Sequence, residues 1–463
     1  MLVRRSLLAV FASGWCASLL PVGCDKSSEP SASADAGGDA AGAGSGATGG
    51  WGAAPSGGAP PTGGIGGSGG ATPDAGMWQP AGDPGWHTPA WACGGISVAT
   101  NPVHGAPPLE WEPCGSGLPG CLRLLVPWQA SIQRIQQARV GRTSPTTIVT
   151  LSFSRDTEHF DTEHFKAVYE DGAPKVVWRY QPGLAPEGCS MTTPEWTPNH
   201  LCVSTTEVFD GAVTVGRQFL LPPTSSGPPL ASWTSTATFP SGCSTELLGA
   251  DDSAGSGWVR DLVSGNEYPL EASPGIAWPP VIHEDIALFR RWWGDGTYIR
   301  LDAWLWKRPN ATAPLVEAPD GEMVYDVQTD GATLVWVQTK SESVLDRAPG
   351  ELWTSPFSKT SSALQPSKRR TTPAISVALS MKRVGSGYYA LIEQPLPAGN
   401  ENWKLHVYRL SDARHWQVAL PGALRPVEVV HVDAEEVWVR AHTMKVADMT
   451  LIRRRIDQLG PGD

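Results

Sequence analysis

The chain has 463 residues, a formal net charge of −11 at pH 7 and only 17% charged residues. Nucleic-acid binding is not expected, because phosphate contacts require clustered Lys and Arg side chains. The 51 Gly and 42 Pro residues indicate many turns, while the 21 Trp residues argue for a folded region, since disordered chains are poor in aromatics.

The first 23 residues have the features of an export signal. Arg4 and Arg5 form a positively charged start, and residues 6–20 form an apolar core that is short for a membrane span. We therefore expect the chain to leave the cytosol.

The signal is followed by Leu20-Pro21-Val22-Gly23-Cys24. This stretch resembles the lipobox of bacterial lipoproteins, in which a small residue precedes a Cys that becomes diacylated. The resemblance implies lipidation at Cys24, a membrane as partner, and a location in the cell envelope of a Gram-negative bacterium. The anchor could face the periplasm or the outer surface. Pro21 departs from the usual Leu, which leaves a plain signal peptide as the alternative.

Residues 24–85 are rich in Gly, Ala, Ser and Pro. Such a composition cannot bury enough apolar surface to offset the entropy lost on ordering. We expect this segment to be a disordered linker between the lipid and a folded domain at residues 86–463.

Six Cys residues remain beyond the signal and Cys24, which in an exported protein predicts three disulfides. Zinc is not expected, because no Cys-x-x-Cys pair occurs. We predict a bridge between Cys189 and Cys202, which are close in sequence and separated by turn-forming residues. The other pairings are open. The six residues are Cys93, Cys114, Cys121, Cys189, Cys202 and Cys243.

The domain shows short apolar runs between Gly, Pro, Asp and Asn, which is typical of many short strands. The one stretch with helical periodicity is Ser131–Arg139, which ends before Gly141. An all-β fold with a single short helix is therefore expected.

A repeat occurs in the second half. A tight turn and an apolar strand appear at residues 284–289, 330–337, 385–391 and 435–439. Each is followed, after a polar loop, by a second strand at residues 301–307, 351–357, 404–410 and 450–454, with an earlier copy at 258–262. The anchors Trp258, Trp306, Trp353, Val407 and Ile452 are separated by 48, 47, 54 and 45 residues. This period, built from strands, predicts a β-propeller.

Residues 250–463 resemble TolB-like propellers of the WD40/PD40 type. The best match is Arg260–Leu270, a strand that ends in an Asp-Leu-x-x-Gly turn before a closing strand. The resemblance implies a fold and no particular activity.

Residues 86–249 would hold three more blades at the same period. Seven blades are predicted in total, and six or eight are the alternatives. The early blades should be irregular and stapled by disulfides, because all six Cys lie there. The chain ends one strand short of a complete last blade. We expect an N-terminal strand at Cys121–Val126 to fill that place and remove the open edge.

Few residues suggest chemistry. The tandem copies Asp156–Phe160 and Asp161–Phe165 contain His159 and His164, which are weak metal candidates because they could converge only in a loop. Trp292 and Trp293 precede Gly-Asp-Gly in an expected hairpin loop, where an indole could stack on a ligand. The indoles of Trp336, Trp353 and Trp438 should instead pack between blades.

No catalytic motif, phosphate-binding loop or calcium loop is found, and no cofactor is expected. The favoured hypothesis is an envelope lipoprotein whose propeller binds a protein or glycan partner without catalysis. The alternative is an exported glycoside hydrolase or lyase whose acidic residues come from separate blades. The two differ at the central channel, where an enzyme should gather carboxylates or His side chains.

Overall fold

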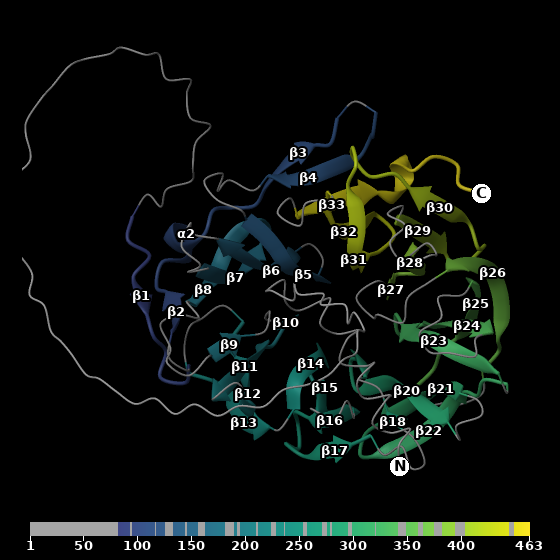
Figure 1. Cartoon of the computed structure of the whole chain (residues 1–463), viewed down its shortest axis with the longest axis horizontal. Helices are drawn as coiled ribbons and strands as arrows, with labels where there is room; N and C mark the ends of the chain where they lie inside the picture. Colours follow the sequence, from purple (N-terminus) through teal and green to yellow (C-terminus); the bar gives the residue numbers. More distant parts are fainter. Residues whose placement is uncertain are drawn as a thin grey trace, which may run out of the picture. The chain divides into compact units, whose positions relative to one another are not determined.

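The chain folds as a seven-bladed β-propeller (Figure 1), in which antiparallel strands run from the centre of the ring outwards. The arrangement is seen in a computed structural model. The predicted signal, Cys24 and nearly all of the predicted linker lie outside the described residues. The structure describes residues 82–92, 95–115, 117–125, 133–143, 146–155, 163–180, 189–191, 195–209, 212–223, 228–235, 237–252, 257–270, 276–277, 280–294, 299–319, 321–340, 349–359, 364–374, 382–393, 403–443 and 449–463.

Blades 1 to 3 come from the first half of the chain. Blade 1 contains β5 (Gln133–Thr143), β6 (Thr146–Arg155), β7 (Glu163–Glu170) and β8 (Ala173–Tyr180), extended outwards by β2 (Ile96–Ala99) and β1 (Trp86–His87). Blade 2 contains β9 (Cys189–Met191) and β10 (Glu195–Trp196), which both pair with β11 (Leu201–Phe209), and then β12 (Ala212–Leu221) and β13 (Ala231–Ser235). Blade 3 contains β14 (Ala237–Cys243), β15 (Leu247–Asp252), β16 (Gly257–Asp261) and β17 (Glu267–Pro269).

Blades 4 to 6 follow the same order. Blade 4 contains β18 (Ile276–Ala277) and β19 (Val281–His283), which both pair with β20 (Ile286–Gly294), and then β21 (Ile299–Lys307) and β22 (Ala311–Val316). Blade 5 contains β23 (Glu322–Thr329), β24 (Thr333–Lys340), β25 (Pro349–Pro356) and β26 (Ser367–Ala374). Blade 6 contains β27 (Lys382–Gly385), β28 (Tyr388–Glu393), β29 (Lys404–Arg409) and β30 (His415–Val418).

Blade 7 is made from both ends of the domain. It contains β31 (Arg425–Val432), β32 (Glu436–His442), β33 (Thr450–Arg455), β4 (Cys121–Leu125) and β3 (Glu110–Pro113). Strand β4 pairs antiparallel with β33, with Arg123 opposite Ile452. The predicted closure of the ring by an N-terminal strand at this position is confirmed. It gives β33 a partner and removes an edge that could pair with another chain.

The predicted repeat is confirmed strand by strand. The five anchor residues all lie in the third strand of a blade, in β16, β21, β25, β29 and β33. The predicted Trp packing is also confirmed. The rings of Trp336 and Trp353 stack with centroids 6.1 Å apart and belong to an apolar cluster with Ile286 of blade 4. Trp438 belongs to an apolar cluster with Phe153 and other residues of blade 1.

The predicted helix at Ser131–Arg139 is wrong, because this part of the chain enters strand β5. Ile135 and Ala138 are both buried, and their spacing of three suggested a helix. The pairing of β5 with β6 contains a β-bulge between Ile135 and Gln137. The extra residue turns Ile135 and Ala138 towards the same face of a strand.

The predicted bridge between Cys189 and Cys202 is also wrong. Cys202 of β11 is bonded to Cys243 of β14, so the disulfide joins blades 2 and 3. Cys189 pairs instead with Glu207, five residues further along β11. The prediction relied on closeness in sequence, but the register between β9 and β11 places Cys189 five residues away from Cys202 along β11. A second disulfide joins Cys114 and Cys121. The expectation of disulfide-stapled early blades is therefore confirmed for Cys202–Cys243, whereas the Cys114–Cys121 bond lies at the β3–β4 hairpin of blade 7. Cys93 and the side chain of Cys189 lie outside the described residues.

Two short helical turns complete the description, α2 (Pro102–Gly105) and η4 (Ile456–Gln458). In the part of the chain that the structure describes, no helix is long and apolar enough to span a membrane.

Candidate functional site

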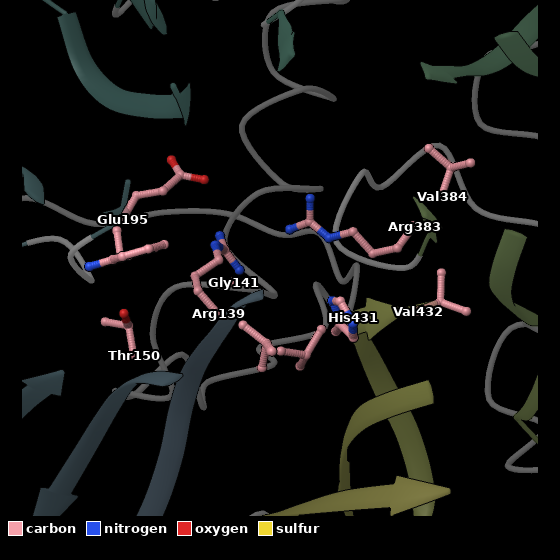
Figure 2. A pocket seen from close by; sticks show the side chains of 11 residues that line it. Arg139, Gly141, Thr150, Glu195, Arg383, Val384, His431 and Val432 are labelled. Carbon is pink, nitrogen blue, oxygen red and sulfur yellow. The ribbon is translucent and has the colours of Figure 1, made fainter. Parts of the chain in front are cut away.

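The innermost strands of four blades line one polar cavity of about 220 Å³ (Figure 2). Arg139 comes from β5 of blade 1, Glu195 and Trp196 from β10 of blade 2, Arg383 from β27 of blade 6 and His431 from β31 of blade 7. Figure 2 shows the two guanidinium groups and the carboxyl group directed into the same space from different walls. We call this space the axial cavity.

The wall between blades 6 and 7 is unusually tight. A Cβ atom at Gly385 of β27 would lie 2.2 Å from the carbonyl oxygen of Val432 in β31. Because only a residue without a side chain permits this approach, Gly385 holds the two innermost strands together. The contact brings Arg383 and His431 to the same side of the axial cavity.

Arg139 is held in place by a buried carboxylate. Its Nη1 donates to Oε1 of Glu428 at 2.8 Å, and Arg440 Nε lies 2.9 Å from the other oxygen of Glu428. Burial alone would lower the pKa of Arg139. The carboxylates of Glu428 and Glu195 outweigh burial and raise that pKa above its usual value. Arg139 is therefore a fixed, permanent cation, with about a third of its side chain exposed (34%).

Arg383 is less satisfied. Its Nε donates to the carbonyl of Val429 at 3.4 Å. Neither of its terminal nitrogens has a hydrogen-bond partner among the residues that the structure describes. Burial, and then repulsion from Arg139, lower the pKa of Arg383 below its usual value. The guanidinium stays charged, because its ordinary pKa is so high. It can still donate several hydrogen bonds to a ligand.

Glu195 is the acidic group of the axial cavity. Burial raises the pKa of Glu195 above its ordinary value, although the cations Arg139 and Arg383 and the backbone N–H of Cys243 act in the opposite direction. A carboxyl group in this state gains a proton more readily than an exposed one. It can accept a hydrogen bond when ionised and donate one when protonated.

His431 is oriented from outside the axial cavity. Its Nε2 lies 2.9 Å from Oδ2 of Asp433. The other oxygen of Asp433 accepts the backbone N–H groups of Glu435 and Glu436, both at 2.8 Å. Burial opposes ionisation of Asp433, but the hydrogen bond from His431 and those from the backbone hold its pKa well below the ordinary range. The carboxylate thereby fixes the orientation of the imidazole.

A second charged cluster lies next to the axial cavity and is sealed. Asp326 of β23 accepts the hydroxyl of Tyr389 at 2.7 Å and lies 3.7 Å from Lys382 Nζ. Lys382 Nζ also donates to the carbonyl of Tyr325 at 3.2 Å. Arg290 Nη1 donates to the same carbonyl at 2.5 Å. We call these residues the Asp326 cluster. Its ion pair is fully buried, with exposed side-chain fractions of 1% for Lys382 and 0% for Asp326.

The two groups of residues together carry an excess of positive charge. Their ionisable side chains form one electrostatic network among the described residues, with five cations and four carboxylates besides the imidazole of His431. The members are Arg139, Arg290, Lys382, Arg383, Arg440, Glu195, Asp326, Glu428 and Asp433. A positive interior in a chain of net charge −11 is a local feature and favours anions at the axis.

A larger hollow of about 730 Å³ lies at the outer side of blade 5, beside Arg369, Arg370 and Arg414. Arg370 donates to Oδ2 and to the carbonyl of Asp463, both at 2.8 Å. Arg369 Nε donates to Thr354 at 2.6 Å. Arg369 and Arg370 are thus partly satisfied within the fold, so the axial cavity is the better candidate site.

The residues predicted as sites do not meet there. Trp292 and Trp293 lie in strand β20, opposite Leu301 and Arg300, and not in a hairpin loop. Their side chains lie outside the described residues. His164 lies in strand β7, opposite Ser154, so it is not in the expected loop. His159 lies outside the described residues, and the metal prediction for this pair stays untested.

One group of three side chains in the described residues has metal-ligand chemistry. The ligand atoms of His200, Cys202 and Cys243 lie within 4.8 Å of one another. Both sulfur atoms belong to the same disulfide, whereas a metal requires thiolates. The group is therefore a covalent link between blades 2 and 3.

The residues of the axial cavity were not singled out from the sequence. They are spread from position 139 to position 431 and share no local motif. The available signal was a charged residue in the innermost strand of a blade, as in Lys382-Arg383 and Glu428. This signal becomes useful only when the blade boundaries are known.

Comparisons with known proteins indicate the fold only. No family model and no curated protein matches the sequence. The β-propeller domain of the trilobed protease from Pyrococcus furiosus is 10% identical over 69% of this chain and 94% of its own, with a TM-score of 0.46. An acylaminoacyl peptidase from Pyrococcus horikoshii is 12% identical over 70% of this chain and 52% of its own, with a TM-score of 0.42.

A putative TolB from Agrobacterium tumefaciens is 11% identical over 54% of this chain and 84% of its own, with a TM-score of 0.30. The structural neighbours thus include a TolB-like protein as well as peptidases. At these levels of similarity none of them assigns an activity. The argument for function depends on this chain's own residues.

Proposed function

We propose that this protein is a binding protein of the cell envelope, and that an acidic group of a protein or glycan partner enters the axial cavity without chemical conversion. The observation that carries the proposal is Arg383. Its terminal nitrogens point into the cavity without a partner among the described residues, beside a second cation, Arg139. Guanidinium groups bind carboxylates through short, paired hydrogen bonds.

The alternative, an exported hydrolase or lyase, is supported by Glu195 and His431, which could exchange protons with a substrate. Glycoside hydrolysis usually needs two carboxyl groups on opposite sides of the bond. Among the described residues, Glu195 is the only carboxylate that lines the axial cavity. Glu428 lies beside it but is held by two arginines. The geometry therefore favours binding over hydrolysis.

The test is a ligand screen on the purified full-length protein with acidic and neutral oligosaccharides and peptides. A ligand at a hundred times its dissociation constant should raise the free energy of unfolding by about 2.7 kcal/mol. The shift should be lost in Arg383→Gln and kept in Arg455→Gln, which changes an exposed arginine of β33. Mass spectrometry should recover the ligand unchanged. Ligand turnover that is abolished by Glu195→Gln would establish the enzyme alternative, and a screen without any Arg383-dependent ligand would refute the binding site.

The envelope location is proposed from the resemblance around Cys24, and it has a separate test. Mass spectrometry of the N-terminal peptide from the native host should show a diacylated Cys24, and Cys24→Ser should release the protein into the soluble fraction. An unmodified N-terminus produced by cleavage elsewhere would support the plain signal peptide.

A further inference from the structure

The ligand chemistry of the axial cavity can be narrowed with Trp196. This residue lies next to Glu195 in β10, and its side chain is half-buried in the cavity wall. A Cβ atom at Gly141 would lie 3.2 Å from Cε3 of Trp196. The glycine therefore lets β5 approach the indole closely, and the ring also packs against the apolar cluster of blades 1 and 2. The part of this fixed indole that remains exposed in the cavity wall can offer an apolar surface to a ligand.

The cavity thus combines three kinds of group within a small volume. It has a flat aromatic surface at Trp196, cationic donors at Arg383 and Arg139, and side chains that can exchange hydrogen bonds with hydroxyl groups at Glu195 and His431. A volume of about 220 Å³ is below the roughly 300–1,000 Å³ of sites that hold drug-sized ligands. The cavity has room for one residue of a larger ligand.

We propose that the axial cavity binds one carboxylate-bearing sugar residue of an acidic glycan, with the sugar ring against Trp196 and its carboxylate on Arg383. This inference rests on the proposed binding function and deepens it. The sugar ring supplies an apolar C–H face for the indole. The carboxylate matches the two terminal nitrogens of Arg383, which have no partner in the part of the chain that the structure describes. The ring hydroxyls are donors and acceptors for Glu195 and His431.

A sugar fits this lining better than a peptide end does. Peptides are commonly recognised by strand addition to a sheet edge, by an apolar groove or by an aromatic-lined proline groove, and acidic peptides by clusters of arginines. The axial cavity has one indole and four groups that can be charged, and its remaining side chains are small. Hydroxyl groups can satisfy both Glu195 and His431, because each hydroxyl donates and accepts. A peptide carboxylate would engage the arginines but bring no stacking surface for Trp196.

The excess of positive charge predicts a preference for acidic over neutral sugars. A neutral sugar of the same shape would cover the guanidinium of Arg383 without supplying a negatively charged hydrogen-bond acceptor. The acidic sugar should therefore bind at least about tenfold more tightly than its neutral counterpart, which corresponds to about 1.4 kcal/mol.

The experiment is calorimetric titration of the full-length protein with short oligosaccharides of galacturonate, glucuronate and mannuronate. Each is compared with its carboxyl-reduced neutral form. A second arm uses short peptides with a free C-terminal carboxylate and the same peptides with a C-terminal amide. The variants are Arg383→Gln, which removes the charge, and Trp196→Leu, which removes the aromatic surface. Arg455→Gln is the matched control, and circular dichroism checks that each variant keeps its strand content.

The expected result is that at least one uronate oligosaccharide binds and that its reduced form binds at least tenfold more weakly. Arg383→Gln and Trp196→Leu should each weaken uronate binding by at least tenfold, and Arg455→Gln should not. If peptide carboxylates bind with the same dependence on Arg383 and no uronate does, the glycan inference is overturned while the binding function stands. If uronates bind equally well to wild type and Arg383→Gln, the axial assignment is overturned. If no probe shows a dependence on Arg383, both proposals fail.

Discussion

The axial cavity and the Asp326 cluster are neighbours made of similar residues, yet they differ in how far their charges are satisfied. In the Asp326 cluster each charged group faces a partner, and its carboxylate also accepts the Tyr389 hydroxyl. In the axial cavity, Arg383 keeps two donors without a partner among the described residues. Lys382 and Arg383 are adjacent in β27 and point to opposite faces of it, one into each environment.

The contrast separates charge that holds the fold from charge available to a ligand. Buried ion pairs are poor evidence of a binding site, because a pair can serve packing alone. A partly exposed cation with unused donors, next to a supported indole, is stronger evidence. The four predictions below test this distinction, from the largest effect to the smallest.

Asp326→Asn should have the largest effect on stability. The change leaves Lys382 and Arg290 buried without a full counter-charge. Removing one partner of a buried pair typically lowers the free energy of unfolding by about 3–5 kcal/mol. Urea denaturation at neutral pH measures the loss. A change below about 1 kcal/mol would show that the cluster is hydrated and not sealed.

Lys382→Gln should lower the free energy of unfolding by about 1–3 kcal/mol, because the Asp326 carboxylate keeps its other donors. Burial lowers the pKa of Lys382 to about 8, below the ordinary value of 10.5. The unfolded chain therefore takes up the proton first as the pH falls. In wild type this group makes stability rise from pH 8 to 10.5, and the rise should be absent from Lys382→Gln. Parallel stability curves for the two proteins would contradict this account.

Arg383→Gln, one residue further along, should change the free energy of unfolding by less than about 0.5 kcal/mol. Among the described residues the side chain has one long hydrogen bond to lose, and removing its charge relieves the repulsion with Arg139 while giving up the attraction of nearby carboxylates such as Glu428. The same denaturation experiment on both variants compares the neighbouring positions directly. A loss as large as that of Lys382→Gln would assign Arg383 to the fold and weaken its role in binding.

Glu195→Gln should leave stability nearly unchanged but alter the pH dependence of binding. Because burial raises the pKa of Glu195, lowering the pH neutralises this carboxylate before an exposed one. The loss of its negative charge should favour an anionic ligand, so affinity in wild type should increase as the pH is lowered from neutrality towards the ordinary carboxyl range. Glu195→Gln should show a smaller increase. Binding titrations of both proteins over a series of pH values measure the difference, and equal slopes would place Glu195 away from the ligand.

The sequence predicted the packing between blades better than the residues of the axial cavity. The walls between blades repeat the same packing problem, so the anchor residues recur at spacings of 47, 54 and 45 residues from Trp306 through Trp353 and Val407 to Ile452. The closing strand could be predicted because an open sheet edge is unfavourable, and β4 supplies the missing partner. These features depend on the burial of apolar side chains, which repeats once in each blade.

The axial site depends on positions that have no common period. Arg139, Glu195 and Arg383 meet only after the ring has closed, and no local pattern marks them. The errors were of the same kind. The bulge at Ile135 imitated a helical spacing, and the register of β11 separated Cys189 from Cys202. In each case the outcome depended on partners elsewhere in the chain.

Ring closure through β4 also sets when the domain can fold. The Thr450 hydroxyl donates to the carbonyl of Leu124, across 326 positions in the sequence. Contacts of such long range form slowly, because a large loop must close before they stabilise anything. A ribosome must finish almost the whole chain before the last blade has its fourth strand. A chain that lacks either β4 or β33 therefore cannot complete the ring.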